Sequence, residues 1–446
     1  MTQTSLERAL LLLIALAYLL VGALFAIRTP DWQAPDEPAH YNYIAQVAVS
    51  GCCPVIEPGD WQQGYQNELT SARFAPELLD ELDTIQYEDH QPPVYYLLAS
   101  VVYQLTSGSL VALRLFSVLI GLGVVLCAYA CAKVIYPERP GVALGAAAFV
   151  AFLPQHVAML SAVNNDGLSE LWIGLTLWAI LRYLRGQNIQ PWHLGLLIGL
   201  IFITKSTGYL MAGVVSLALV LRWWGGEHRN FGQLLRAGLL FLIPALVIGG
   251  LWWGRNISVY GFPDFLGLGA HDLVVADQPR TADFIAEFGS ERYINQAVRD
   301  TFNSFWGQFG WMALPLQGWM YQLFQALTGL ALAGLLLPRS MRREASSPPD
   351  ERRFRQQSWI VLGAVIVLAF AAYIFYNTEF LQFQGRYLFP ALIPLGLLLA
   401  LGVDAWRRWL LRGLPGAQWL PVGVFLLLAV FDVYLIWRVI LPGLAP

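Results

Sequence analysis

The sequence predicts an all-α polytopic membrane protein with about eleven transmembrane helices and a long first extracytoplasmic loop. Three observations predict this class. Hydrophobic residues make up 57% of the 446 residues and charged residues 13%, and the mean hydropathy is +0.53, too apolar for a soluble protein of this size. Apolar runs close to the length of a membrane span recur along the chain. The connections between them are mostly short and polar, so no soluble domain is expected.

The first apolar run covers residues 9–27 and follows Arg8. No small-residue cleavage site follows it, so we expect a retained helix with a cytoplasmic N-terminus. Residues 28–110 are rich in Asp, Glu, Pro and Trp and are expected to form the first extracytoplasmic loop. Within this loop, residues 92–106 are apolar, rich in tyrosine and short for a span. They are expected to form a juxtamembrane helix along the outer membrane face.

The placement of basic residues supports this topology. If residues 92–106 do not span, most of the 27 Lys and Arg residues fall on the cytoplasmic side, as the positive-inside rule expects. If they do span, every later basic cluster turns outward. The clusters are Lys133 and Arg139; Arg182 and Arg185; Arg222, Arg229 and Arg236; Arg339, Arg342, Arg343, Arg352, Arg353 and Arg355; and Arg407, Arg408 and Arg412.

The other spans are expected at residues 111–135, 141–162, 167–184, 192–204, 207–224, 234–254, 318–337, 358–376, 388–403 and 418–440. The odd count places the C-terminus outside the cell. Residues 255–317 become a second large extracytoplasmic loop, and residues 338–357 a basic cytoplasmic loop. The chain is thus interpreted as one domain, residues 1–446, integral to the cytoplasmic membrane. Nothing in its charge pattern indicates a nucleic-acid partner.

The most suggestive polar cluster follows the first helix, in the segment PDEPAHYNY. Asp36, Glu37 and His40 are expected beside a short helix that begins near Pro38, close to the membrane surface. Fixed carboxylates suit general base catalysis. Acidic residues also stabilise the start of an ordinary helix, so both interpretations stand at this point.

A second polar turn, SAVNNDG, brings Asn165 and Asp166 to the outer junction of two helices. Asn, Asp and Gly are common turn residues, and the same position suits a contact with substrate or metal. Asp36, His40 and Asp166 are candidate ligands for a divalent cation, since they offer hard oxygens and one imidazole. The metal remains an alternative, because the proposed chemistry does not require a cofactor.

Basic and aromatic residues are expected on the same outer face. A single basic residue at a helix end commonly extends to lipid headgroups, whereas several that converge suit an anionic phosphate or pyrophosphate. The aromatic residues of FWGQFGWM suit either sugar stacking or the interfacial belt. The residues concerned are Arg114, Lys205, Arg255, Arg386, Trp306 and Trp311.

The remaining unusual residues are one carboxylate and four cysteines. Asp432 lies within the last span and is either functional or bonded to a neighbouring helix. Cys127 and Cys131 lie in an apolar run and are expected to be small core residues. Cys52 and Cys53 are adjacent in the first loop, and we expect two free thiols, although an oxidising compartment would permit a disulfide.

The order of these motifs resembles the GT-C superfamily of membrane glycosyltransferases, which use polyprenyl-phosphate-linked sugars. The nearest branches are the protein O-mannosyltransferases, the lipid A aminoarabinose transferases and a bacterial family of largely unassigned activity. The motif HQPP at His90 departs from the family pattern by its inserted Gln91. The matching segments are PDEPAH, HQPP, RLFSVLIGLGVVLCAY, SAVNNDGL, the segment around Lys205, WWGRNISVYG, FWGQFGWM and QGRYLFP.

The resemblance implies inverting transfer of a sugar from a polyprenyl-phosphate donor to a hydroxyl of a lipid, glycan or protein acceptor. Asp36 would act as general base, with Glu37 or Asp166 in support. Lys205, Arg255, Arg386 and Arg114 would stabilise the departing phosphate. His40, His90 and Asn165 are further candidate substrate-binding residues.

Two other functions use the same features. A transporter or flippase for lipid-linked sugars also needs basic residues near anionic headgroups, but would be expected to show internal repeats and broken helices at mid-membrane. No internal repeat is evident in the sequence. A non-catalytic subunit of a membrane assembly would use the loops to bind protein partners.

Overall fold

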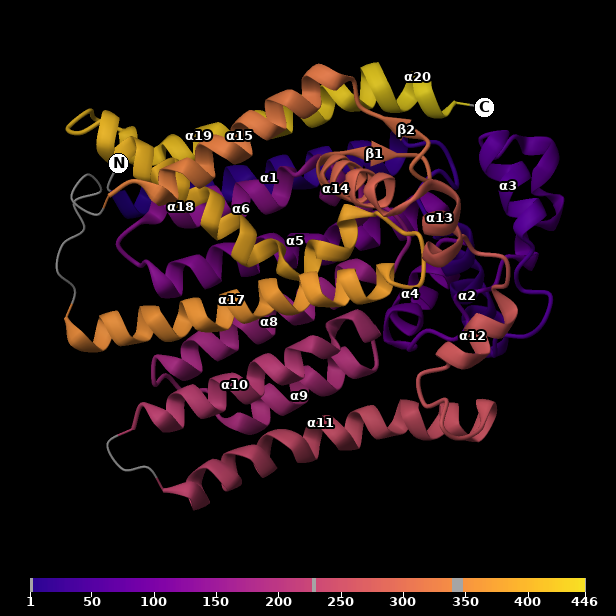
Figure 1. The fold of residues 1–446 in the computed structure, drawn as a ribbon, viewed down its shortest axis with the longest axis horizontal. Coiled ribbons are helices and arrows are strands. Elements are labelled where there is room, and N and C mark those ends of the chain that lie inside the picture. Colours follow the sequence, from indigo (N-terminus) through magenta and orange to yellow (C-terminus); the bar gives the residue numbers. More distant parts are fainter. Residues whose placement is uncertain (1–2, 227–229, 339–347, 446) are drawn as a thin grey trace.

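The computed structural model describes residues 3–226, 230–338 and 348–445. Long helices lie side by side, and short helices and loops gather at one end of the bundle (Figure 1). The long helices are α1 (Gln3–Arg28), α5 (Leu110–Ile135), α8 (Asp166–Leu184), α10 (Leu210–Trp224), α11 (Phe231–Tyr260), α15 (Gly318–Leu336), α17 (Pro349–Asn377), α18 (Leu392–Leu410) and α19 (Leu420–Leu435). Shorter elements within the bundle are α6 (Pro140–Phe152), α7 (Pro154–Leu160), α9 (Pro191–Phe202), η2 (Ser206–Tyr209), η4 (Ala417–Trp419), the π-helical η5 (Ile436–Ile440) and α20 (Leu441–Leu444).

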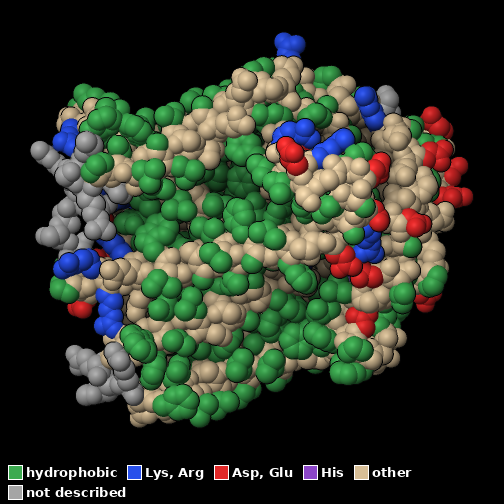
Figure 2. Space-filling model, viewed as in Figure 1, with side chains coloured by type: hydrophobic (Ala, Val, Ile, Leu, Met, Phe, Trp, Pro, Cys, Tyr) green, Lys and Arg blue, Asp and Glu red, His purple; other side chains and the backbone are tan. Residues whose placement is uncertain are grey.

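We call the end that carries the short helices the loop end. Its two short strands pair antiparallel, with Gln308 opposite Pro315. Figure 2 shows acidic side chains gathered at this end, whereas hydrophobic side chains cover the length of the bundle. The loop end contains α2 (Glu37–Ser50), α3 (Gln63–Ser71), η1 (Pro76–Thr84), α4 (Val94–Leu105), α12 (Leu268–Val274), α13 (Thr281–Phe288), α14 (Ser290–Trp306), β1 (Gln308–Phe309), β2 (Leu314–Pro315) and η3 (Gly385–Ala391).

The predicted all-α polytopic class is confirmed. Within the described residues, eight helices are long and apolar enough to cross a membrane, or nine if α6 and α7, bent by 65°, form one broken span. The expected count of about eleven spans would require α8 and α9 to cross the membrane as well. The apolar run of α8 contains Glu170 and Arg182, and α9 has 12 residues. The two ends of the chain lie at opposite ends of the bundle (Figure 1), which agrees with an odd number of crossings.

The tyrosine-rich segment expected at residues 92–106 forms α4. Its 12 residues extend about 18 Å, which is too short to cross a bilayer. The helix packs against α2 and α5. Buried Tyr95 and Tyr96 face this packing, and Tyr96 stacks on Tyr43 of α2 with ring centroids 3.6 Å apart. The segment is therefore a short helix of the loop end, as expected.

The second half of the basic loop expected at residues 338–357 is helical. Residues 339–347 and Arg229, which were assigned to cytoplasmic loops, lie outside the described residues, but α17 already begins at Pro349. The acidic Asp350 and Glu351 in its first turn stabilise the positive end of the helix dipole. Glu351 also pairs with Arg185 at 2.7 Å, which gives the polar extension of the helix a partner in the bundle.

Candidate active site at the loop end

Asp36 and Glu37 are neighbours in the sequence but face different environments. Asp36 adopts a left-handed backbone conformation, with φ 65°, directly before α2, and such a conformation is uncommon outside glycine. Its side chain makes no capping hydrogen bond to the helix. The Asp36 carboxylate therefore does not cap α2, and its position is not explained by a role at the start of the helix.

Two side chains from distant segments hold the Asp36 carboxylate. Tyr87 donates its hydroxyl hydrogen to Oδ1 at 2.9 Å, and Arg386 donates from Nη2 to Oδ2 at 2.6 Å. Burial acts to raise the pKa of Asp36, but the charges of Arg386 and His40 and the two hydrogen bonds outweigh it. The pKa therefore lies below its ordinary value. Asp36 is ionised at neutral pH and remains 24% exposed.

The position of Arg386 depends on a close approach of two chain segments. Arg386 lies in η3, and Gly385 before it donates its backbone N–H to Ser304 Oγ at 2.8 Å. A Cβ atom at Gly385 would collide with the backbone of Phe305. Only glycine fits this contact, so QGRYLFP and FWGQFGWM are two halves of one packing unit that directs Arg386 toward Asp36.

Glu37 and Arg114 form a buried ion pair away from solvent. Arg114 donates from Nε to Glu37 Oε1 at 2.8 Å and from Nη2 to Oε2 at 2.5 Å. Its Nη1 also donates to the backbone oxygens of Ala26 and Thr29, at 3.2 and 2.8 Å. Both side chains are almost fully inaccessible. The structure thus assigns them to joining α1, α2 and α5, and it does not support the predicted roles in base support and phosphate binding.

A second ion pair lies near Asp36. Lys205 Nζ contacts Asp166 Oδ1 at 2.5 Å and donates to Asn165 Oδ1 at 2.7 Å. Asn165 donates to the hydroxyl of Tyr96 at 3.3 Å, and that hydroxyl is 2.9 Å from His40 Nδ1. The predicted residues Asn165, Asp166, Lys205 and His40 are therefore brought into one connected polar network.

A cavity of about 530 Å³ opens beside Asp36 and Arg386. It is bounded by α3, by the segment before α4, and by the loops around Gln278, Trp311 and Gln384. Its walls carry amide and aromatic side chains in addition to the ion pair. The lining residues that matter below are Asp36, Glu88, Arg386, Gln66, Gln278, Trp61 and Trp311.

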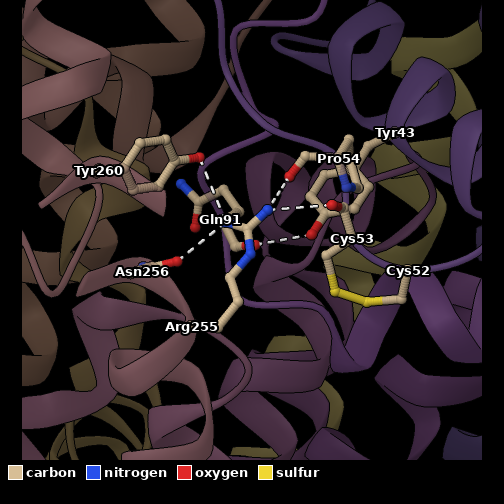
Figure 3. The surroundings of a disulfide bond; sticks show 8 residues. All are labelled: Tyr43, Cys52, Cys53, Pro54, Gln91, Arg255, Asn256 and Tyr260. Carbon is tan, nitrogen blue, oxygen red and sulfur yellow. Dashed lines mark hydrogen bonds between the residues drawn. A yellow bond between two sulfur atoms is a disulfide. The ribbon is translucent and has the colours of Figure 1, made fainter. Parts of the chain in front are cut away.

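Arg255 binds protein backbone at the loop end. Figure 3 shows its guanidinium directed at the carbonyl oxygens of Cys53 and Pro54, with Tyr260 and Asn256 beside it. Its two terminal nitrogens donate to these protein groups, and its predicted role in substrate binding stays a prediction. Arg255 anchors the loop that contains Cys53.

The prediction of free thiols at Cys52 and Cys53 was wrong. The two residues form a disulfide between sequence neighbours, which appears in Figure 3 next to the Arg255 contacts. Cys127 and Cys131 are free and buried, which confirms their expected place in the core. The cysteines thus divide between the loop end and the bundle.

His90 is buried next to His271, with ring centroids 4.5 Å apart. Its Nδ1 lies 3.1 Å from the backbone oxygen of Tyr87. Burial and the neighbouring His271 hold the pKa of His90 well below its ordinary value, so the ring is neutral at neutral pH. His90 therefore contacts the backbone of Tyr87 and does not itself line the cavity.

The three candidate metal ligands are not assembled into one coordination site. Asp36 pairs with Arg386, Asp166 pairs with Lys205, and His40 faces Tyr96. Over residues 3–226, 230–338 and 348–445, no group of three or more His, Cys, Asp or Glu side chains is arranged to hold a metal. In this arrangement the positive charges beside the carboxylates come from Lys205 and Arg386.

Trp306, Trp311 and Asp432 lie in three different environments. Trp306 is buried and stacks on Phe324 at 4.3 Å between ring centroids, so it is a core residue. Trp311 lines the cavity and donates its indole N–H to the oxygen of Trp32 at 2.9 Å. Asp432 is fully buried in α19, and neither carboxylate oxygen has a hydrogen-bond partner in the described part of the chain.

Sequence reasoning missed several residues of this site. Tyr87 and Glu88 lie directly before the HQPP motif, where the polar run YED gave the only signal. Gln66 and Gln278 belong to segments that show no pattern connecting them to Asp36. These four residues reach the cavity through tertiary packing of the two outer loops.

Asp89, next to Glu88, makes the stability of the loop end dependent on pH. Its side chain is fully buried and accepts one hydrogen bond, from Gln46 at 2.7 Å. Burial raises the pKa of Asp89 from 3.8 to about 8. The folded protein thus keeps a proton that the unfolded chain releases, so Asp89 contributes stability at pH 4 that is lost as pH rises toward 8.

In Asp89→Asn this contribution should be absent, because the amide does not ionise. Thermal unfolding at pH 5 and pH 8.5 measures the effect, with exposed Asp80→Asn on η1 as the control. From the lower to the higher pH, the stability of Asp89→Asn should fall less, or rise more, than that of the unmodified protein, whereas Asp80→Asn should change as the unmodified protein does. The same change in Asp89→Asn as in the unmodified protein would contradict the prediction.

The helical bundle with its loop-end cavity has the fold of GT-C membrane glycosyltransferases, and the chain is an integral, multi-pass membrane protein. Residues 90–253 match the family model described as dolichyl-phosphate-mannose-protein mannosyltransferase. This match includes Asp166 and Lys205 but ends before Arg386. The resemblance predicted from the motifs is thereby confirmed.

Among solved structures, the chain is similar to ArnT from Cupriavidus metallidurans, an aminoarabinose transferase. The structure of ArnT bound to undecaprenyl phosphate aligns over 99% of this chain and 74% of ArnT, with 16% identity and a TM-score of 0.53. The apo structure aligns over 97% and 73%, with 17% identity and a TM-score of 0.54. No curated protein matches the sequence significantly.

Proposed function

We propose that the protein transfers a sugar from a polyprenyl-phosphate donor to an acceptor hydroxyl, with inversion, on the extracytoplasmic face of the cytoplasmic membrane. The main support is the Asp36 carboxylate, held ionised beside a cavity by Arg386 and Tyr87. ArnT, which shares the fold, has been crystallised with undecaprenyl phosphate. In this proposal the N-terminus is cytoplasmic and the C-terminus extracytoplasmic.

Asp36 is the proposed general base. The acceptor oxygen attacks the anomeric carbon from the face opposite the phosphate, its proton passes to Asp36, and the sugar–oxygen bond breaks with its electron pair moving to the phosphate. Asp36 is accessible, ionised and within the cavity, as a base must be. Its low pKa alone would make it a weak base.

Arg386 links donor binding to the strength of this base. Its Nη2 contacts Asp36 in the free protein, and a donor phosphate placed beside it would compete for the same guanidinium. Weakening of the ion pair raises the pKa of Asp36 and makes the carboxylate more basic once the donor is bound. Arg386 then stabilises the negative charge that develops on the leaving phosphate.

Lys205 is the second proposed phosphate ligand. Its ammonium is 16% exposed and lies between Asp166 and Asn165. Asp36 and Asp166 would thus hold Arg386 and Lys205, respectively, in place before the donor binds. Because Lys205 and Arg386 supply the positive charge, the proposed reaction needs no metal.

Lys205→Met and Arg386→Met should each weaken binding of undecaprenyl phosphate by roughly ten- to a hundredfold, the value of a hydrogen bond to a charged group. Titration of the purified protein in detergent measures this. Arg280→Met is the control, because Arg280 pairs with exposed Glu379 outside the cavity. An equal loss in the control, or no loss in either test variant, would contradict the assignment.

A further inference from the structure

We infer that the outer part of the cavity binds an uncharged, hydroxyl-rich acceptor, a neutral glycan. That this glycan is the acceptor rests on the proposed function, whereas its chemical class is inferred from the cavity walls. Three features of the walls lead to this class of ligand. They are buried amide atoms without hydrogen-bond partners, the lack of an unpaired cation among the described lining residues, and aromatic rings of fixed orientation.

The amide of Gln66 is the first feature. Gln66 lies on α3, lines the cavity and is 6% exposed, yet neither its Nε2 nor its Oε1 has a hydrogen-bond partner in the described residues. Across the cavity, Gln278 Oε1 is also unpaired. Buried polar atoms are nearly always paired. A ligand that both donates and accepts, as a hydroxyl does, would satisfy both groups.

The charges of the cavity disfavour an anionic acceptor. Among the described lining residues, Arg386 is the single Lys or Arg, and it is already paired with Asp36. In the proposed reaction it turns to the donor phosphate. Glu88 also lines the cavity, and its carboxyl group offers no positive charge to an anion. A phosphate or carboxylate on the acceptor would therefore meet Asp36 without a free partner.

Two tryptophans with fixed orientation complete the walls. Trp61 donates its indole N–H to the backbone oxygen of Ala276 at 3.2 Å, and Trp311 donates to that of Trp32 at 2.9 Å. These bonds leave the rings as apolar surfaces at the cavity. A sugar ring, with hydroxyls on its edge and C–H groups on its faces, matches amides and aromatic rings together.

The binding of free sugars to the purified full chain tests this inference. The probes are methyl α-mannopyranoside and maltotriose, compared with mannose 6-phosphate and glucuronate by titration calorimetry. The neutral probes should bind more tightly than the charged ones. Tighter binding of a charged probe, or no binding of the neutral probes, would overturn the inference.

Variants of α3 identify the site. Gln66→Leu should weaken binding of the neutral probes by at least about tenfold, the value of one or two lost hydrogen bonds. Its ligand-free melting temperature should stay equal or rise, because the substitution removes an unpaired buried amide. Gln62→Leu is the matched control, since Gln62 is exposed and does not line the cavity. Equal affinity of both variants for the neutral probes would show that the probes do not bind at Gln66 and would overturn the assignment of the site.

Competition separates the acceptor from the donor sugar. Saturating undecaprenyl phosphate should leave mannoside binding intact, and so should undecaprenyl-phosphate mannose. Displacement by the mannose-bearing lipid alone would assign the amides to the donor sugar and overturn the acceptor role. Transfer activity with an anionic acceptor would overturn the inference but leave the proposed function standing. Binding of neutral sugars without any transfer would overturn the proposed function but leave the binding of a neutral glycan in the cavity standing.

Discussion

Asp36→Asn is expected to lower sugar transfer by roughly 10²- to 10⁴-fold, the usual effect of removing a general base. The amide keeps the size of the side chain but cannot take the acceptor proton. It also no longer neutralises Arg386, which contacts Asp36 at 2.6 Å. Undecaprenyl phosphate should therefore bind at least as tightly as it does to the unmodified protein. The measurements are transfer of radiolabelled sugar and titration with the lipid.

Asp31→Asn is the control for this variant. Asp31 is in the same loop, but its side chain is 68% exposed and it does not line the cavity. Full transfer in Asp36→Asn would refute the mechanism. Loss of lipid binding together with transfer would instead assign Asp36 to the binding of the donor. The pH profile of kcat/KM adds a second test: because the pKa of Asp36 in the free enzyme is lowered by Arg386 and His40, the acid limb that this group causes should lie below that of an ordinary aspartate.

Arg114→Met should destabilise the protein by about 3–5 kcal/mol, because it leaves the buried Glu37 carboxylate without its cation. Glu37 is completely inaccessible and receives two hydrogen bonds from Arg114. The backbone oxygens at the end of α1 also lose their donor. Thermal unfolding and the fraction of monodisperse protein after extraction measure this loss.

The double variant Glu37→Gln/Arg114→Met should recover part of this stability, since no unpaired charge remains. Arg299→Met is the control, because its pair with Asp300 is on the surface, where ion pairs contribute little. Normal stability of Arg114→Met with weakened binding of undecaprenyl phosphate would restore the role that the sequence suggested for Arg114. The two readouts thus separate a structural arginine from a phosphate ligand.

Some of the residues predicted for the site lie together in the structure. Asp36 and Arg386 are 350 residues apart, yet both were expected on one face, because the positive-inside rule fixes the side on which each helix end lies. Asp166 and Lys205 were expected on that face for the same reason, and they form an ion pair. Helix ends on one face can still lie far apart. Arg114 and Arg255 were therefore expected to act like Arg386, although Arg114 binds the buried Glu37 and Arg255 binds backbone oxygens.

The sequence by itself determined the class of the protein and the end of the bundle at which polar chemistry is possible. Hydropathy and charge placement decide these points, since they depend on transfer between water and lipid and act on each segment separately. Tertiary structure alone decided which of the two adjacent carboxylates reaches the cavity. Asp36 faces the cavity and Glu37 is buried, because the left-handed turn before α2 directs the two side chains apart and Arg114 reaches one of them. The unpaired amide of Gln66 likewise exists only after α3 folds over the site.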